Sequence, residues 1–136
     1  MKKISVLAAV LLIVAISSSA LAANWVHVAT GNDDIVGSID LYVDKDSIKY
    51  GMHSESFQFS RSDGFSANIK VIGELTEIGR VGFFTERDKK YWVTLDDIDD
   101  SGNVVNADNH RDEKCYYNVA EGYWITIYEY VQSNLP

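Results

Sequence analysis

Apolar and polar residues alternate along most of the chain in short runs that are separated by turn-forming residues. This alternation is typical of β-strands that bury one face and expose the other. The pattern predicts strands over residues 24–30, 39–43, 52–61, 68–75, 80–86 and 91–98. Clusters of Gly, Asn, Asp and Ser predict turns at residues 31–34, 62–64 and 99–103, and a hairpin at residues 88–90.

The last segment, residues 123–131, carries two conflicting patterns. Its aromatic and β-branched residues favour a strand by propensity. Four of its apolar side chains nevertheless recur with the spacing of one helical face: Trp124, Ile127, Tyr128 and Val131. Ile125 falls outside that face, but the periodicity still favours a helix. The sequence therefore predicts an α+β domain, a mainly antiparallel β-sheet of about six strands with a C-terminal helix packed on it.

The first 22 residues have the organisation of a secretory signal peptide. Two lysines precede an apolar run over residues 4–16, and small residues follow up to Ala22. This order predicts cleavage between Ala22 and Ala23. The run is shorter than the roughly 20 residues of a membrane span, so we interpret it as a signal peptide rather than as a membrane anchor. No later segment of the sequence is apolar enough to cross a membrane, and we expect no transmembrane segment after cleavage. Residues 23–136 would then form one exported domain in the periplasm, on the outer cell surface or in the medium.

The mature chain is expected to be strongly acidic. The full sequence carries 12 basic and 20 acidic residues. Cleavage would remove Lys2 and Lys3, so the formal charge would change from −8 to −10. Such a surface repels nucleic acid and anionic membranes, and we expect neither as a partner. A protein partner is expected instead, and a basic protein would be electrostatically compatible.

Cys115 is the only cysteine of the chain, so an internal disulfide is excluded. In an oxidising compartment its thiol is either buried or available for a disulfide between two chains. Open sheet edges offer a second way for two copies to pair. Both features are compatible with a homodimer.

An acidic segment matches part of a calcium-binding loop. Oxygen-bearing side chains stand at positions 1, 3, 5 and 12 of such a loop, namely Asp97, Asp99, Ser101 and Asp108. Position 12 is Asp rather than Glu, and the preceding segment is a predicted strand rather than a helix. An acidic β-turn in which Gly102 adopts a positive φ explains the same residues. We favour the turn and expect no metal or other cofactor, with the calcium loop as the alternative.

No pattern predicts a catalytic centre, and the chain is not expected to be an enzyme. His27, His53 and His110 lack the spacing of metal ligands and are expected at the surface or at a sheet edge. Cys115 has no base beside it in the sequence, and Ser47 is not part of a nucleophile elbow.

Asp44 and Asp46 could form a carboxylate pair, but their position suggests a structural role. They precede Ile48 in a segment, residues 44–47, that has the capping oxygens of a single helical turn. We therefore interpret them as turn and cap residues rather than as an acid–base pair.

Tyrosine and tryptophan are abundant in the last quarter of the chain. Tyr116 and Tyr117 are candidates for an interaction surface, because both residue types are enriched at interface hot spots. Neighbouring residues of a strand face opposite sides, so one of the two is expected to point inward and the other outward. Trp124 and Tyr128 lie on the apolar helical face, where core packing explains them better.

Several motifs follow one another in a distinctive order. They are Trp25, the block 41–49, a strand with Phe57 and Phe59, the segment 91–93, the turn 100–105, and a helix that ends near Val131. In this order they resemble the surface-adhesin protein E family of small exported bacterial domains. The family often has Pro-Gly-Ser before its last helix and a cysteine pair, where this chain has Glu121-Gly122-Tyr123 and Cys115 alone. Characterised adhesins of this family bind host matrix proteins, so the resemblance implies a similar binding role.

These observations lead to one expected function and two alternatives. The expected function is that of an exported, non-catalytic binding domain, surface-associated and adhesin-like. One alternative is a periplasmic acidic inhibitor that captures a basic enzyme such as lysozyme. The other is a calcium-dependent module that uses the acidic turn.

Overall fold

The computed structural model describes residues 23–35, 37–105, 116–120 and 122–136. Within these residues the chain forms strands, one 3-10 turn and one α-helix. In chain order they are β1 (Trp25–Asp33), β2 (Gly37–Asp44), η1 (Lys45–Ser47), β3 (Lys49–Ser54), β4 (Phe59–Ile72), β5 (Thr76–Glu86), β6 (Lys89–Asp97), β7 (Tyr116–Asn118) and α2 (Tyr123–Ser133). The expected α+β class and the C-terminal helix are confirmed.

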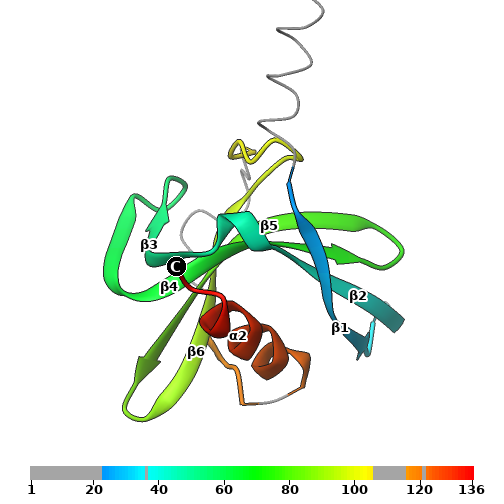
Figure 1. Ribbon diagram of the computed structural model, residues 1–136. Coiled ribbons are helices and arrows are strands. Elements are labelled where there is room, and N and C mark those ends of the chain that lie inside the picture. The colour runs from blue at the N-terminus through cyan, green and yellow to red at the C-terminus, as the bar shows by residue number, and fades with distance from the viewer. Residues whose placement is uncertain (1–22, 36, 106–115, 121) are drawn as a thin grey trace, which may run out of the picture.

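All strands belong to one antiparallel sheet of order β1-β2-β4-β5-β6-β7, and β3 also pairs with β4. The long strand β4 organises the sheet. β2 pairs with its last four residues and β3 with its first half, while β5 runs along the opposite edge. The chain therefore follows one edge of β4 from β2 to β3 and turns a corner at η1 (Figure 1).

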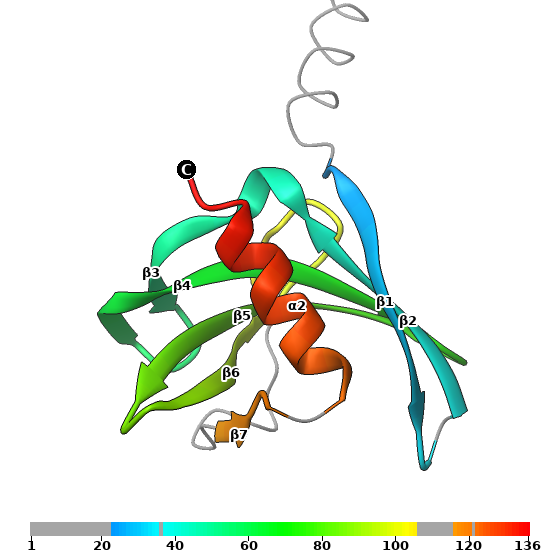
Figure 2. The ribbon, with the colours of Figure 1, turned by 60° about the horizontal axis from the view of Figure 1, so that its bottom comes forward.

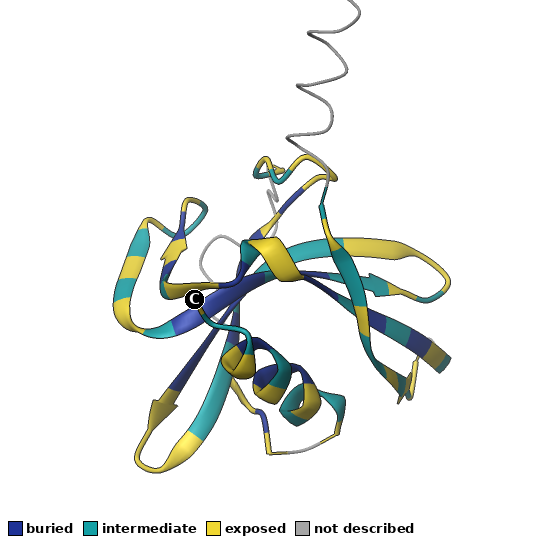
Figure 3. Cartoon of the chain, viewed as in Figure 1, coloured by how far each residue is buried: buried dark blue, intermediate teal, exposed yellow. Residues whose placement is uncertain are grey.

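The main core lies between the sheet and α2, which crosses one face of the sheet (Figure 2). Alternate residues of β2, β4 and β5 point toward the helix, as the two-residue period of a strand requires. Tyr128 of α2 contacts two aromatic rings below it, Phe65 at 5.1 Å and Phe83 at 5.8 Å between ring centroids. Ile127 and Val131, from the predicted apolar face, are completely buried. The buried face of the helix and the exposed opposite face are visible in Figure 3.

The single strand predicted over residues 52–61 is wrong. β3 ends at Ser54, residues 55–58 form a turn, and β4 begins at Phe59. The alternation of apolar and polar residues continues through the turn, where Phe57 is partly buried, and it therefore does not reveal the turn. The turn is fixed by a carboxylate that lies about forty positions further along the chain, and no local pattern reveals such a contact.

The turn predicted at residues 62–64 is also wrong, because β4 runs through it without a break. Gly64 has a φ of +86° inside the strand, opposite a register shift between Tyr50 and Met52 of β3. A Cβ atom at Gly64 would overlap the carbonyl oxygen of Phe83. Glycine is required here by an irregularity of the sheet and by close backbone approach, not by a chain reversal.

The carboxylate that fixes the 55–58 turn belongs to Asp96 of β6, whose side chain is fully buried. Its oxygens accept hydrogen bonds from the Ser56 N–H at 2.9 Å and from Arg80 Nη1 at 3.0 Å. The Ser54 hydroxyl lies 3.0 Å from Asp96 Oδ1 and 2.7 Å from the Leu95 carbonyl oxygen. Burial raises the pKa of Asp96, but the donors from residues 54–56 outweigh it and the pKa is lowered overall. The ionised carboxylate therefore holds the β3–β4 turn against β6.

Removal of this carboxylate should destabilise the fold strongly. Asp96→Ala leaves Arg80 and the donors of residues 54–56 without their acceptor, and we expect a loss of about 3–5 kcal/mol in the free energy of unfolding at pH 7. Because the folded pKa of Asp96 is lowered, its contribution is present above the ordinary pKa of Asp and disappears as the pH falls through the folded value. Urea unfolding at pH 7 and at pH 3 measures both effects.

The exposed pair Arg61–Asp63 provides the control, since its carboxylate lies in solvent. Asp63→Asn should change the unfolding free energy very little. An equal loss in Asp63→Asn and Asp96→Ala would contradict the assigned role of Asp96.

Two glycines with nearly the same positive φ test the close contact in β4. Gly64 (φ +86°) faces the Phe83 carbonyl, whereas Gly102 (φ +83°) has no atom within 4 Å of the position of a Cβ. Gly102→Ala should cost about 1 kcal/mol from backbone strain alone. Gly64→Ala adds a steric overlap and should cost more than about 3 kcal/mol. Equal unfolding free energies in the two variants would show that the overlap is absent.

Candidate functional site: an aromatic surface beside strand β7

Four aromatic side chains from three elements form a continuous group on the helix side of the sheet. Trp92 of β6 stacks on Trp124 of α2, with ring centroids 3.8 Å apart and planes 18° apart. Tyr117 of β7 stacks on the same Trp92 at 5.1 Å, and Tyr123 lies 5.7 Å from Trp124. We call Tyr117, Trp92, Trp124 and Tyr123 the aromatic surface.

Strand register and helix position bring these rings together. Tyr117 is the direct partner of Trp92 in the β6–β7 ladder, and directly opposed residues of neighbouring strands place their side chains on the same face. α2 begins at Tyr123, after Gly122 at a φ of +64°, so the first turn of the helix carries Trp124 onto Trp92. The indole N–H of Trp92 is buried without a hydrogen-bond partner in the described part of the chain.

Tyr123 connects the aromatic surface to β1, which lies at the other end of the strand order. Its ring lies directly over Gly31 of β1, where a Cβ atom would come within 2.7 Å of Tyr123 Cε1 and closer still to Cδ1. Burial, helped by the negative charge of Asp33, raises the pKa of Tyr123. Glycine at position 31 therefore lets the start of α2 approach β1.

The two predicted interaction residues lie together on β7, but on opposite faces. Tyr117 belongs to the aromatic surface, while Tyr116 meets the edge of Phe84 on the other face at 5.8 Å. The two side chains therefore point to opposite faces of one strand, but the inward position expected for one of them is wrong. Neither ring is buried, with 47% of Tyr116 and 52% of Tyr117 exposed.

The sequence indicates Tyr117 as an interaction candidate and Trp124 as a core residue, and it assigns no site to Trp92 or Tyr123. Trp92 lies 25 positions before Tyr117, and no spacing in the sequence connects them. Only the pairing of β6 with β7 and the docking of α2 bring them into contact. The general abundance of aromatic residues was the one available sign.

A polar cluster occupies the open face of β1 and β2. His27 Nε2 lies 3.1 Å from both Thr30 Oγ1 and Asp40 Oδ1, and the Thr30 hydroxyl donates to Asp40 at 2.8 Å. These contacts, Thr30 first and then His27, lower the pKa of Asp40. A catalytic relay uses the two ring nitrogens for different partners, whereas here one nitrogen contacts both. His27 and His53 are exposed, as expected, and His110 lies outside the described residues.

The acidic turn is held together by its own first carboxylate. Asp99 Oδ1 accepts from the N–H groups of Ser101 and Asn103, both at 2.9 Å. The Asn103 donor is the main cause of the lowered pKa of Asp99. Gly102 has the positive φ that the turn interpretation requires. Asp97 and Ser101 are exposed, and Asp108 lies outside the described residues. Within residues 23–105 and 116–136, gaps excepted, no group of three His, Cys, Asp or Glu side chains is arranged to hold a metal.

A cleft of about 240 Å³ lies between this turn, η1 and the start of β1. Its lining includes Ala23, Trp25, Asp44, Asp46 and the turn 99–102. Asp44 caps η1, as expected, by accepting from the Asp46 N–H at 3.2 Å. Ser47 also has a structural role, because its hydroxyl donates to the Asp44 carbonyl oxygen and accepts from the Asn68 N–H. Cys115 and the residues up to Ala22 lie outside the described residues.

We expect calcium to leave the stability of the domain unchanged, because Asp99 already uses Oδ1 for two backbone donors of the turn. A ligand that binds only the folded state must raise the melting temperature. Thermal unfolding in 2 mM calcium and in excess chelator should therefore coincide. A higher melting temperature with calcium, abolished by Asp97→Asn, would instead support the calcium-dependent module.

Comparison with known proteins found no match for this chain among protein-family models, curated proteins or solved structures. The resemblance to the surface-adhesin protein E family therefore stays a prediction. No helix in the described part of the chain is both long and apolar enough to cross a membrane.

Proposed function

We propose that the chain is an exported, non-catalytic binding domain whose protein partner docks on the aromatic surface. The observation that carries this proposal is the position of Tyr117. Its ring is half exposed and stacks on Trp92, which in turn stacks on Trp124. A preformed aromatic group of this kind offers a large contact area at a small cost in side-chain entropy.

The choice of a protein as partner follows from charge and residue type. With a net charge of −10 after cleavage, nucleic acid and anionic lipid are disfavoured. Tyrosine and tryptophan are the side chains most often found at protein hot spots. Among the described strands β7 ends the strand order on this side of the sheet, and a partner could contact the ring of Tyr117 and the edge of this strand together.

The class of partner is suggested by the family resemblance. Adhesins of the surface-adhesin protein E family bind host matrix proteins, and an exported domain would meet such proteins outside the cell. Export is part of the proposal and is supported by the organisation of residues 1–22. Surface location and adhesin-like binding to matrix proteins are the specific form that we propose.

Binding of the exported domain to immobilised matrix proteins, measured by surface plasmon resonance, tests the proposal. Replacement of Tyr117 by Ala should weaken binding at least tenfold, because the ring is the exposed end of the aromatic surface. Trp92 and Trp124 are left intact, since they also attach the helix to the sheet. Circular dichroism should confirm that Tyr117→Ala keeps the native fold.

Tyr50 of β3 is a matched control, since it is a tyrosine with 64% of its surface exposed on a different strand. Tyr50→Ala should change the dissociation constant less than twofold. Equal effects of the two substitutions would place the contact elsewhere. Absence of binding to any matrix protein, together with slower substrate turnover by lysozyme on mixing, would favour the acidic inhibitor.

A further inference from the structure

The first described residues of the chain line the cleft between η1 and the 99–102 turn, which we call the acidic cleft. Ala23 and Trp25 both line it, and Asn24 between them is fixed on two sides. The Asn24 N–H donates to Asp44 Oδ1 at 3.0 Å, and the Asn24 carbonyl accepts from the Lys45 N–H at 2.9 Å. Three covalent bonds separate the backbone nitrogens of Ala23 and Asn24. The Ala23 nitrogen therefore lies within about 7 Å of Asp44 Oδ1.

We propose that the acidic cleft receives the α-ammonium group that cleavage between Ala22 and Ala23 creates. Hydrolysis of this peptide bond by a signal peptidase consumes one water, leaving a carboxylate on Ala22 and an ammonium group on Ala23. The group that occupies the cleft is thus supplied by the chain itself, at a position already fixed by the two hydrogen bonds of Asn24.

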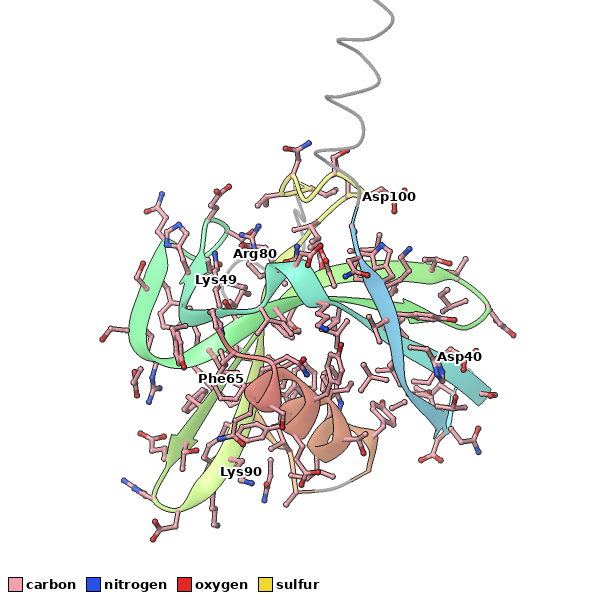
Figure 4. The ribbon with its side chains drawn as sticks, viewed as in Figure 1. Asp40, Lys49, Phe65, Arg80, Lys90 and Asp100 are labelled. Atoms are coloured by element: carbon pink, nitrogen blue, oxygen red, sulfur yellow. The ribbon has the colours of Figure 1, made fainter. Side chains whose placement is uncertain are left out.

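The charges around the cleft favour a cation at this position. Four aspartates line it, Asp44 and Asp46 from the η1 corner and Asp99 and Asp100 from the turn. Figure 4 shows Asp100 close to the start of β1. The nearby cations are Lys45 of η1, Lys70 of β4, whose ammonium nitrogen lies 4.5 Å from the centre of the Trp25 ring, and Arg80 of β5, whose Nη2 lies 3.5 Å from the Gly102 carbonyl oxygen. Arg80 is also paired with the buried carboxylate of Asp96. The carboxylates outnumber these cations, so a new ammonium group lowers the repulsion between the aspartates.

The expected consequence is a fold that becomes more stable when the leader is removed. Attraction to the aspartates would raise the pKa of the α-amino group above its ordinary value. The stabilisation is then fully present below the ordinary value and is lost as the pH rises through the raised one. This inference rests on the predicted cleavage site and does not depend on the proposed binding function.

The test uses the full chain, exported and processed by a bacterial host. Mass spectrometry and N-terminal sequencing establish the cleavage position. A second form carries two extra glycines between Ala22 and Ala23, so that cleavage leaves the ammonium group two residues away from the cleft. At pH 7 and low salt the native mature form should melt about 2–5 °C higher than the extended form. The difference should vanish at pH 10.5 and in 1 M sodium chloride.

Charge variants identify the acceptor. Asp46→Asn with Asp100→Asn removes two carboxylates of the cleft whose oxygens accept no hydrogen bond from other described residues. This double substitution should abolish the difference in melting temperature between the native and the extended form. Glu74→Gln with Glu129→Gln changes the net charge equally away from the cleft and should retain it. Equal melting of the two forms at pH 7, a difference that survives pH 10.5 or the aspartate variant, or cleavage at another bond would overturn the proposal.

Discussion

The packing of α2 on β4 and β5 is the contact on which the candidate site depends. An isolated helix of eleven residues is only marginally stable in water, so α2 forms because its apolar face is covered by the sheet. Tyr128 lies against Phe65 and Phe83, and the labelled Phe65 side chain is seen between sheet and helix in Figure 4. With this contact in place, the first turn of α2 places Trp124 against Trp92. The aromatic surface is thus a product of tertiary packing rather than a local motif.

Carboxylates hold the backbone in place where the chain changes direction. Asp44, Asp96 and Asp99 each accept hydrogen bonds from backbone N–H groups at a corner, namely at η1, at the 55–58 turn and at the 99–103 turn. Backbone donors at such corners have no strand partner, and a carboxylate satisfies them well because the bond is charge-assisted. Part of the acidity of the sequence therefore serves the fold, and net charge alone overstates how much of it is available to a partner.

The elements predicted correctly from the sequence are those whose pattern is local. The helix follows from the spacing of Trp124, Ile127, Tyr128 and Val131, and the capped turn follows from Asp44. The turn predicted at residues 31–34 is wrong for its first three positions, because β1 continues to Asp33. The two other errors lie where a distant residue decides the conformation. Residues 55–58 turn because Asp96 accepts hydrogen bonds from their N–H groups. Glycine is required at position 64 inside β4 because the Phe83 carbonyl oxygen lies where a Cβ atom would be. For the same reason Tyr117 could be proposed from residue type alone, while its contact with Trp92 required the strand register.

β1 is the element that connects the acidic cleft with the aromatic surface. Its first residues enter the cleft, and its Gly31 receives the ring of Tyr123 from the start of α2. Among the described strands β1 pairs only with β2, and the ends of an edge strand open more easily than those of a central one. A charge interaction that fixes the start of β1 would therefore also steady the strand against which Tyr123 rests. If both proposals hold, processing at the N-terminus would be linked to the rigidity of the proposed binding surface through this one strand.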